Sequence, residues 1–142
     1  MFVKQLTIFL ENRAGSLEEV TAALKNHNVN ILSLSLADTS EYGLLRLIVS
    51  DPELGRDVLK ENGFSAMLTE VIAVKLENKV GMLQQLLEVI GESGLSIEYM
   101  YALASTEVGA MIIKTNDGAN AVAALKKANM EILDGETVYT IR

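Results

Sequence analysis

The sequence contains one structural unit twice. The segment LENRAGSL, which starts at Leu10, aligns with LENKVGML, which starts at Leu76, at an offset of 66 residues (76 − 10). The offset continues to the C-terminus without a gap, and identical residues recur along it, among them Gly43 and Gly109. Identical residues that recur in order through strands, helices and turns predict a duplicated supersecondary unit.

Within the first unit the pattern predicts the element order βαββαβ. Ser16, followed three residues later by Glu19, predicts a helix that starts with a capping box. Asp51-Pro52 predicts a second helix, because Pro suits the first helical turn. Apolar, β-prone stretches predict strands over 2–11, 29–37 and 42–49, and from about residue 65. The second unit repeats this pattern, with expected helices over 82–93 and 117–128 and strands near 95–104, 108–115 and 131–141.

This element order predicts an α+β fold made of two ferredoxin-like βαββαβ sandwiches in tandem, each an antiparallel sheet with its helices on one face. We expect a first domain over 1–69 and a second over 70–142. Residues 72–76 align both with the first strand of the first unit and with the last strand of the second. We therefore expect one continuous strand, about 66–77, to join the domains rigidly, because no Pro/Gly/Ser-rich linker separates them.

Charge and composition narrow the classes of function. The formal net charge of −7 disfavours nucleic acid and anionic membranes as partners. With no Cys and one His, the chain offers no thiolate metal site and no Cys nucleophile, so we expect no metal, no cofactor and no catalytic residues. The start MFVKQLTIFLENR lacks a cleavage pattern, and no apolar run is long enough to span a bilayer. These features favour a cytoplasmic protein.

The turn before the first helix of each unit is the strongest candidate site. Gly15 and Gly81 lie where a positive φ is often required, and free amides at a helix start can accept a carboxylate. Asn12 and Asn78 offer a donor and an acceptor, which suits a zwitterion. The alternative is that Asn and Gly only form a strand-to-helix turn.

Two charged pairs flank these turns, and the sequence leaves their roles open. Arg13 and Lys79 either attract an anion or are exposed charges at a helix start. Glu11 and Glu77 either reach an ammonium group or, because strand alternation turns them away from the Asn side chains, are solvated or salt-bridged.

Each unit contains a pair of motifs that resembles those of the ACT domain. The pair is N-R-A-G-S-L followed by V-N-I-L-S-L in the first unit, and N-K-V-G-M-L followed by L-S-I-E-Y-M in the second. The resemblance covers essentially the whole chain, as a free-standing pair of ACT domains. It implies domains that pair side by side, with amino acids bound at the interface between them. It also implies ligand contacts from the turn and from an Asn at the start of the second strand. Carried over, these contacts are Asn12, Arg13, Ala14, Gly15, Ser16, Leu17 and Asn30 in the first unit, and Asn78, Lys79, Val80, Gly81, Met82 and Leu83 in the second.

Two departures from the family pattern predict an asymmetric site. Ala14 and Val80 stand where many members have Pro, so the turn is less fixed in φ. Asn30 corresponds to Ser96, which is shorter and has one polar atom fewer. We therefore expect the ligand to bind near the turn of the first unit.

Consecutive apolar residues, including Leu47 and Ile48 as well as Ile112 and Ile113, predict strands buried on both faces. Since helices cover one face, a second sheet is expected on the other, either between the units or in a homodimer. The sequence favours an amino acid-binding regulatory protein of amino acid metabolism, with a metabolic enzyme as a possible partner. The alternatives are an interaction or dimerisation module without a ligand and, less favoured, an acylphosphatase-like enzyme. An enzyme is disfavoured because no nucleophile–base pair or phosphate-binding glycine loop is visible.

Overall fold

The computed structural model describes residues 2–11, 13–38, 42–104 and 109–141. By its internal contacts the chain divides into two compact units. We call Lys4–Thr69 with Tyr139–Ile141 the first unit, and residues 2–3 with Glu70–Val138 the second unit. The division falls between Thr69 and Glu70, while a few residues near each end of the chain group with the other unit.

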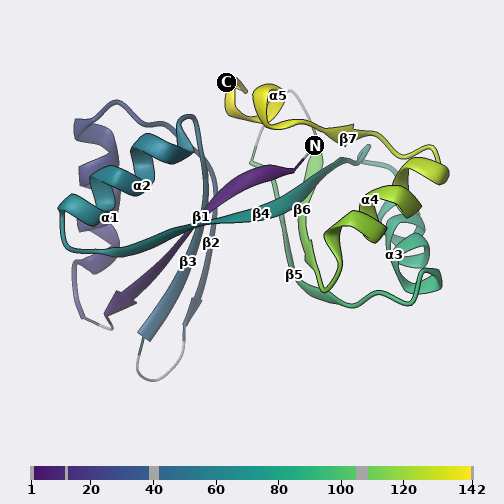
Figure 1. Cartoon of the computed structure of the whole chain (residues 1–142), viewed down its shortest axis with the longest axis horizontal. Helices are drawn as coiled ribbons and strands as arrows, with labels where there is room; N and C mark the ends of the chain where they lie inside the picture. Colours follow the sequence, from purple (N-terminus) through teal and green to yellow (C-terminus); the bar gives the residue numbers. More distant parts are fainter. Residues whose placement is uncertain (1, 12, 39–41, 105–108, 142) are drawn as a thin grey trace. The chain divides into compact units, whose positions relative to one another are not determined.

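The first unit is a four-stranded sheet with two helices on one face (Figure 1). The strands follow the order β2-β3-β1-β4, and β3 pairs antiparallel with both β1 and β2. This is the predicted ferredoxin-like βαββαβ arrangement, which is thereby confirmed. Its elements are β1 (Val3–Glu11), α1 (Ser16–Asn26), β2 (Ile31–Asp38), β3 (Tyr42–Val49), α2 (Pro52–Glu61) and β4 (Ser65–Lys75).

The core of the first unit lies between this sheet and its helices. Alternate residues of β1 and β3 point inward, so that Ile8 and Leu47 are fully buried. Val20 and Leu24 of α1, which are one turn apart, cover them from the helical layer and are also fully buried. Burying one such side chain stabilises the fold by about 1.5–3 kcal/mol, so this core fixes how α1 lies on the sheet.

The second unit repeats the arrangement with a shorter last strand (Figure 1). Its sheet has the order β5-β6-β4-β7, with Ile72 of β4 opposite Ile113 of β6 and Ala73 opposite Leu133 of β7. Leu86 and Ile90 of its first helix are buried against this sheet. Its further elements are α3 (Met82–Glu92), β5 (Ile97–Ala102), β6 (Ala110–Thr115), α4 (Gly118–Lys127), β7 (Ile132–Leu133) and α5 (Gly135–Tyr139).

The expected strand over 131–141 is wrong beyond its first residues. Only Ile132 and Leu133 pair with β4, and Gly135–Tyr139 forms the short helix α5. Asp134 starts this helix: its carboxylate accepts a hydrogen bond from the Thr137 amide (2.8 Å). This contact lowers the pKa of Asp134 below its ordinary value. The repeat alignment predicted a strand here, but Asp134 is a favourable N-cap residue and starts a helix instead.

The strand β4 takes part in both sheets. It runs without a break from Ser65 to Lys75, where the sequence suggested a strand of about 66–77. In its first half, the hydroxyls of Thr69 and Thr7 of β1 are hydrogen-bonded at 2.9 Å. Its second half pairs with β6 and β7. One segment therefore acts as the last strand of the first unit and the first strand of the second.

Both faces of the central strands are buried, as the consecutive apolar residues predicted. Leu47 belongs to the core of the first unit, and its neighbour Ile48, which points to the opposite face, is also fully buried. Ile112 and Ile113 are fully buried in the same way. None of the described helices is long and apolar enough to cross a membrane.

Candidate ligand-binding site

The turn between β1 and α1 is built around Gly15. This residue has φ 86° and ψ −4°, a left-handed conformation that L side chains adopt at a cost. A Cβ at Gly15 would meet no atom within 4 Å, so the backbone angle alone favours glycine here. The amide of Glu19 donates to the Gly15 carbonyl (3.0 Å) and makes the first helical hydrogen bond of α1. The prediction of a positive φ at Gly15 is confirmed.

The predicted capping box is wrong, because Gly15 and not Ser16 occupies the N-cap position. The Ser16 hydroxyl instead donates back to the Glu11 carbonyl (3.0 Å). No side chain among the described residues caps α1, and the amides of Leu17 and Glu18 have no acceptor among them. The described residues thus leave these amides at the positive end of the helix dipole without a side-chain acceptor, while Glu18 and Glu19 lie in the same first turn.

Other helices of the chain are closed at the same position. The Asp51 carboxylate accepts from the Leu54 amide at the start of α2 (3.2 Å), and Asp117 accepts from Asn120 at the start of α4 (3.2 Å). The second copy of the turn, in contrast, again has a left-handed Gly81 and no side-chain cap. Among the described residues, the helix after the candidate turn therefore lacks a side-chain cap in each unit, whereas α2 and α4 each have one.

An ion pair lies beside the turn of the first unit. The Arg13 guanidinium holds Glu19 through two contacts, Nη2–Oε2 at 2.7 Å and Nη1–Oε1 at 3.1 Å, and its Nε approaches Glu11 at 3.4 Å. The hydrogen bond to Glu19 raises the pKa of Arg13, and that to Arg13 lowers the pKa of Glu19. Of the two roles left open for Glu11, the structure supports the salt-bridged one. Arg13 likewise has carboxylate partners within its own chain.

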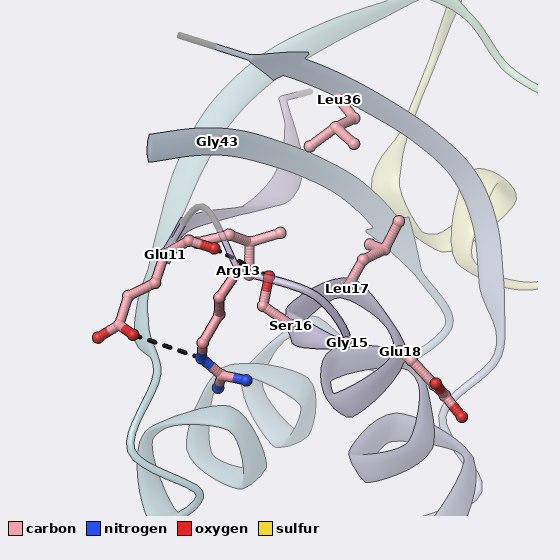
Figure 2. A pocket seen from close by; sticks show the side chains of 9 residues that line it. Glu11, Arg13, Gly15, Ser16, Leu17, Glu18, Leu36 and Gly43 are labelled. Atoms are coloured by element: carbon pink, nitrogen blue, oxygen red, sulfur yellow. Dashed lines mark hydrogen bonds and ion pairs between the residues drawn. The ribbon is translucent and has the colours of Figure 1, made fainter. Parts of the chain in front are cut away.

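A cavity of about 350 Å³, here called the turn cavity, opens beside the start of α1 (Figure 2). Figure 2 shows Leu17 and Leu36 on one side of the turn and the Glu11–Arg13 pair on the other. The cavity therefore combines an apolar wall with a charged one, at the open end of a helix. It is lined by Leu10, Glu11, Arg13, Gly15, Ser16, Leu17, Glu18, Leu36 and Gly43.

The structure brings together only part of the predicted site. Arg13, Gly15, Ser16 and Leu17 line the turn cavity, and Ala14 is exposed beside it. Asn12 lies outside the described residues, so its role stays a prediction from the sequence. Asn30 lies toward the other end of α1, in a cavity of about 460 Å³ with Lys25 and Asn28.

The backbone of Asn30 joins the start of β2 to the end of β3. Its amide donates to the Ser50 hydroxyl (2.9 Å), and its carbonyl accepts from the Ser50 amide (2.9 Å). Sequence reasoning missed Leu36 and Gly43, which lie on β2 and β3. The alternation of β2 could have pointed to Leu36, because Leu36 lies opposite the inward-facing Leu45.

In the second unit the predicted residues are largely exposed. Val80 is fully exposed, Leu83 is 45% exposed, and Lys79 pairs with Glu77 at 2.7 Å. Met82 lines a cavity of about 240 Å³ with Glu77, Gln85 and Met130. Among the described residues, no group of three or more acidic or His side chains is placed to hold a metal ion.

The comparisons with known proteins identify the family. The chain matches the family described as the ACT domain pair over residues 1–141, and it belongs to that family. No curated protein matches it. A crystal structure of protein BT0572 from Bacteroides thetaiotaomicron is 35% identical, with a TM-score of 0.93, and the match covers 99% of this chain and 98% of that one.

Two further similar structures are regulatory subunits of aspartate kinase. The one from Thermus thermophilus is 17% identical with a TM-score of 0.61, over 88% of this chain and 91% of that one. The one from Thermus flavus is also 17% identical, with a TM-score of 0.58, over 89% and 92%. At this identity the likeness concerns the fold.

Proposed function

We propose that this protein is a non-catalytic regulatory protein of amino acid metabolism that binds a free amino acid in the turn cavity of its first unit. The observation that carries the proposal is an uncapped helix start that opens into a cavity with one charged and one apolar wall. The ligand carboxylate would accept from the amides of Leu17 and Glu18. Its ammonium group would lie near Glu11, and its side chain against Leu17 and Leu36.

Membership in the ACT domain pair family supports this assignment. The similar structures from Thermus support a regulatory role in particular, since their titles describe regulatory subunits of aspartate kinase. By the same comparison, we propose a metabolic enzyme as partner.

We further propose that the protein acts as a homodimer through the edge of β2. This strand is the last of its sheet in the first unit, and Leu34 and Leu36 on it are 46% and 47% exposed. An edge strand with exposed leucines is a surface to which a second strand can add. Because Leu36 also lines the turn cavity, a ligand there would bias the assembly state through contacts that differ between monomer and dimer.

The second candidate function, an interaction module without a ligand, is favoured by the charge at the turn. Glu11, Glu18 and Glu19 surround the single guanidinium of Arg13 there. This surplus of negative charge opposes the approach of a carboxylate.

A thermal-shift screen against the free amino acids separates the two candidates. A ligand present at about 100 times its dissociation constant adds roughly 2.7 kcal/mol of stability, so its melting shift is readily measured. Among the variants, Asn12→Ala should reduce the shift more than its counterpart Asn78→Ala. Failure of every amino acid to raise the melting temperature would favour the interaction module. Equal losses in the two variants would exclude an asymmetric site.

A further inference from the structure

We infer that a second cavity of the first unit, here called the aromatic cavity, binds a zwitterionic amino acid with an aromatic side chain. This cavity has a volume of about 400 Å³ and adjoins the turn cavity, with which it shares Arg13 and Ser16. It is enclosed by the end of β1, the start of α1 and the segment between α2 and β4. A volume of this size is typical of small-molecule sites.

One wall of the aromatic cavity consists of rings. Phe9 and Tyr42 form a tilted pair, with ring centroids 5.7 Å apart and planes at 53°, and they are 46% and 43% exposed. Phe64 also lines the cavity and packs partly against the core. A planar apolar group placed here would cover rings that otherwise face water, in the offset or edge-on geometry that aromatic side chains prefer. The wall therefore favours an aromatic side chain in the ligand.

The aromatic cavity is also lined by the two charges that a zwitterion needs, those of Arg13 and Glu19. Arg13 and Glu19 hold each other in a bidentate pair at 2.7 and 3.1 Å, with side chains 46% and 52% exposed. Because an exposed ion pair contributes little stability, separating it costs little. An amino acid that enters would place its carboxylate on Arg13 and its ammonium group on Glu19. One ion pair is then replaced by two, and the guanidinium fork keeps a planar carboxylate partner.

The second unit contains the same cavity without these features. Shifted by 66 residues, eight of the eleven lining positions line a cavity of about 240 Å³. Phe9 becomes Lys75, which approaches Glu131 at 3.6 Å, and Glu19 becomes the uncharged Gln85. A lysine repels the ligand ammonium, and a carboxamide attracts it less than a carboxylate does. We expect the second cavity not to bind the same ligand, so the chain carries its own matched control.

The two cavities share Leu10, Glu11, Arg13 and Ser16, so the two proposals are distinguished by the residues that line only one of the cavities. Phe9 and Glu19 line the aromatic cavity and not the turn cavity. Leu17 and Leu36 line the turn cavity and not the aromatic cavity.

L-Tryptophan is the probe of choice, because the protein contains no Trp and indole fluorescence reports the ligand alone. Titration of the full chain should give saturable binding that L-alanine does not compete away. Tryptamine, which lacks the carboxylate, and indole-3-propionate, which lacks the ammonium group, should each bind at least about tenfold more weakly. Equal affinity for all three indoles would overturn the zwitterion assignment, and absence of L-tryptophan binding would overturn the site.

Variants then place the binding in the first unit. Glu19→Gln, which is nearly isosteric, and Phe9→Lys should each weaken L-tryptophan binding about tenfold or more, whereas Gln85→Glu in the second unit should leave it unchanged. Circular dichroism and the melting temperature confirm that each variant folds. Unchanged affinity in folded Glu19→Gln contradicts the inference. It is also contradicted if Phe9→Lys alters the oligomeric mass while leaving the affinity intact, since the rings would then form a contact between copies.

Discussion

The turns at Gly15 and Gly81 have nearly the same backbone, with φ values of 86° and 87°, and each precedes a helix without a side-chain cap. Their side chains differ. The first turn carries the Arg13–Glu19 pair, while the second pairs Lys79 with Glu77 and has Gln85 in place of Glu19. The duplicated unit has thus kept the backbone of the turn and changed its chemistry, as expected if the two sites do not share one ligand.

The other residues with a left-handed backbone also keep their conformation between the two units while their residue type changes. Among the described residues, every positive φ occurs in a pair at the repeat offset: Gly15 with Gly81, Asn28 with Gly94, and Gly63 with Asn129. Gly and Asn replace each other in two of these pairs because Asn tolerates the left-handed region better than most residues. The repeat preserves conformations more closely than residue types.

The largest expected difference between the units concerns the glycines that begin the third strand of each. A Cβ at Gly109 would lie 2.6 Å from the backbone oxygen of Leu76, whereas one at Gly43 would meet its nearest atom, Leu36 Cδ1, at 3.5 Å. Gly109→Ala should therefore destabilise the protein by about 3 kcal/mol, because a backbone atom cannot easily move aside. Gly43→Ala should cost under about 1 kcal/mol. Urea denaturation of both variants measures this, and equal costs would mean that the two hairpins do not differ as described.

A smaller and equal effect is expected at the two turns. Gly15→Ala and Gly81→Ala should each cost about 1–2 kcal/mol, since the left-handed backbone is strained for L residues and no neighbouring atom adds a clash. Gly15→Asn, measured alongside by denaturation, should cost less than Gly15→Ala. A clearly larger loss in one turn than in the other would show that contacts beyond φ stabilise it.

We expect α2 and α4 to lose similar amounts of stability when their capping Asp is removed. Asp51→Ala and Asp117→Ala each remove the side-chain acceptor at the start of α2 or α4, at an expected cost of about 1 kcal/mol in thermal unfolding. Ser16→Ala removes a hydroxyl that does not cap α1, so its cost should be below that of either Asp variant. A Ser16 effect as large as those of the caps would contradict the assignment of Gly15 as N-cap.

The smallest effect is the pH dependence of the two turn ion pairs. The hydrogen bond from Arg13 lowers the pKa of Glu19, and that from Lys79 lowers the pKa of Glu77. A lowered carboxyl pKa means that each pair stabilises the folded chain above the ordinary glutamate range and that this contribution is lost as the pH falls through the lowered value. Since the side chains are exposed, the change in stability should be slight.

Carboxyl carbon NMR titrations resolve the two groups separately. Arg13→Ala should return the pKa of Glu19 toward its ordinary value and leave Glu77 unchanged, while Lys79→Ala should do the reverse. Cross-effects between the turns would contradict the independence of the two pairs.

Most of the fold was predictable from the sequence because its signals are local. The helical spacing of Val20 and Leu24 and the Asp51-Pro52 start each act over a few neighbouring residues, and the structure bears them out. The repeat then carries the same local signals into the second unit. The exceptions arose where two signals competed. The repeat suggested a strand over 131–141, but Asp134 caps a helix there, and Gly15 displaced Ser16 from the N-cap position.

The candidate site was less predictable, because it depends on which side chains meet in space. The motif identified the turn and Gly15, and the φ of 86° agrees with the expectation. Only the tertiary structure shows that Arg13 pairs with Glu19 and that Leu36 lines the cavity at the turn. It also shows that Asn30 lies toward the other end of α1. The sequence by itself predicts two units with the same order of strands, helices and turns, because periodicity and turn chemistry are properties of adjacent residues. The sequence also shows that residue types such as Glu19 and Gln85 differ between the turns, but which side chains they meet depends on packing, which brings distant residues together.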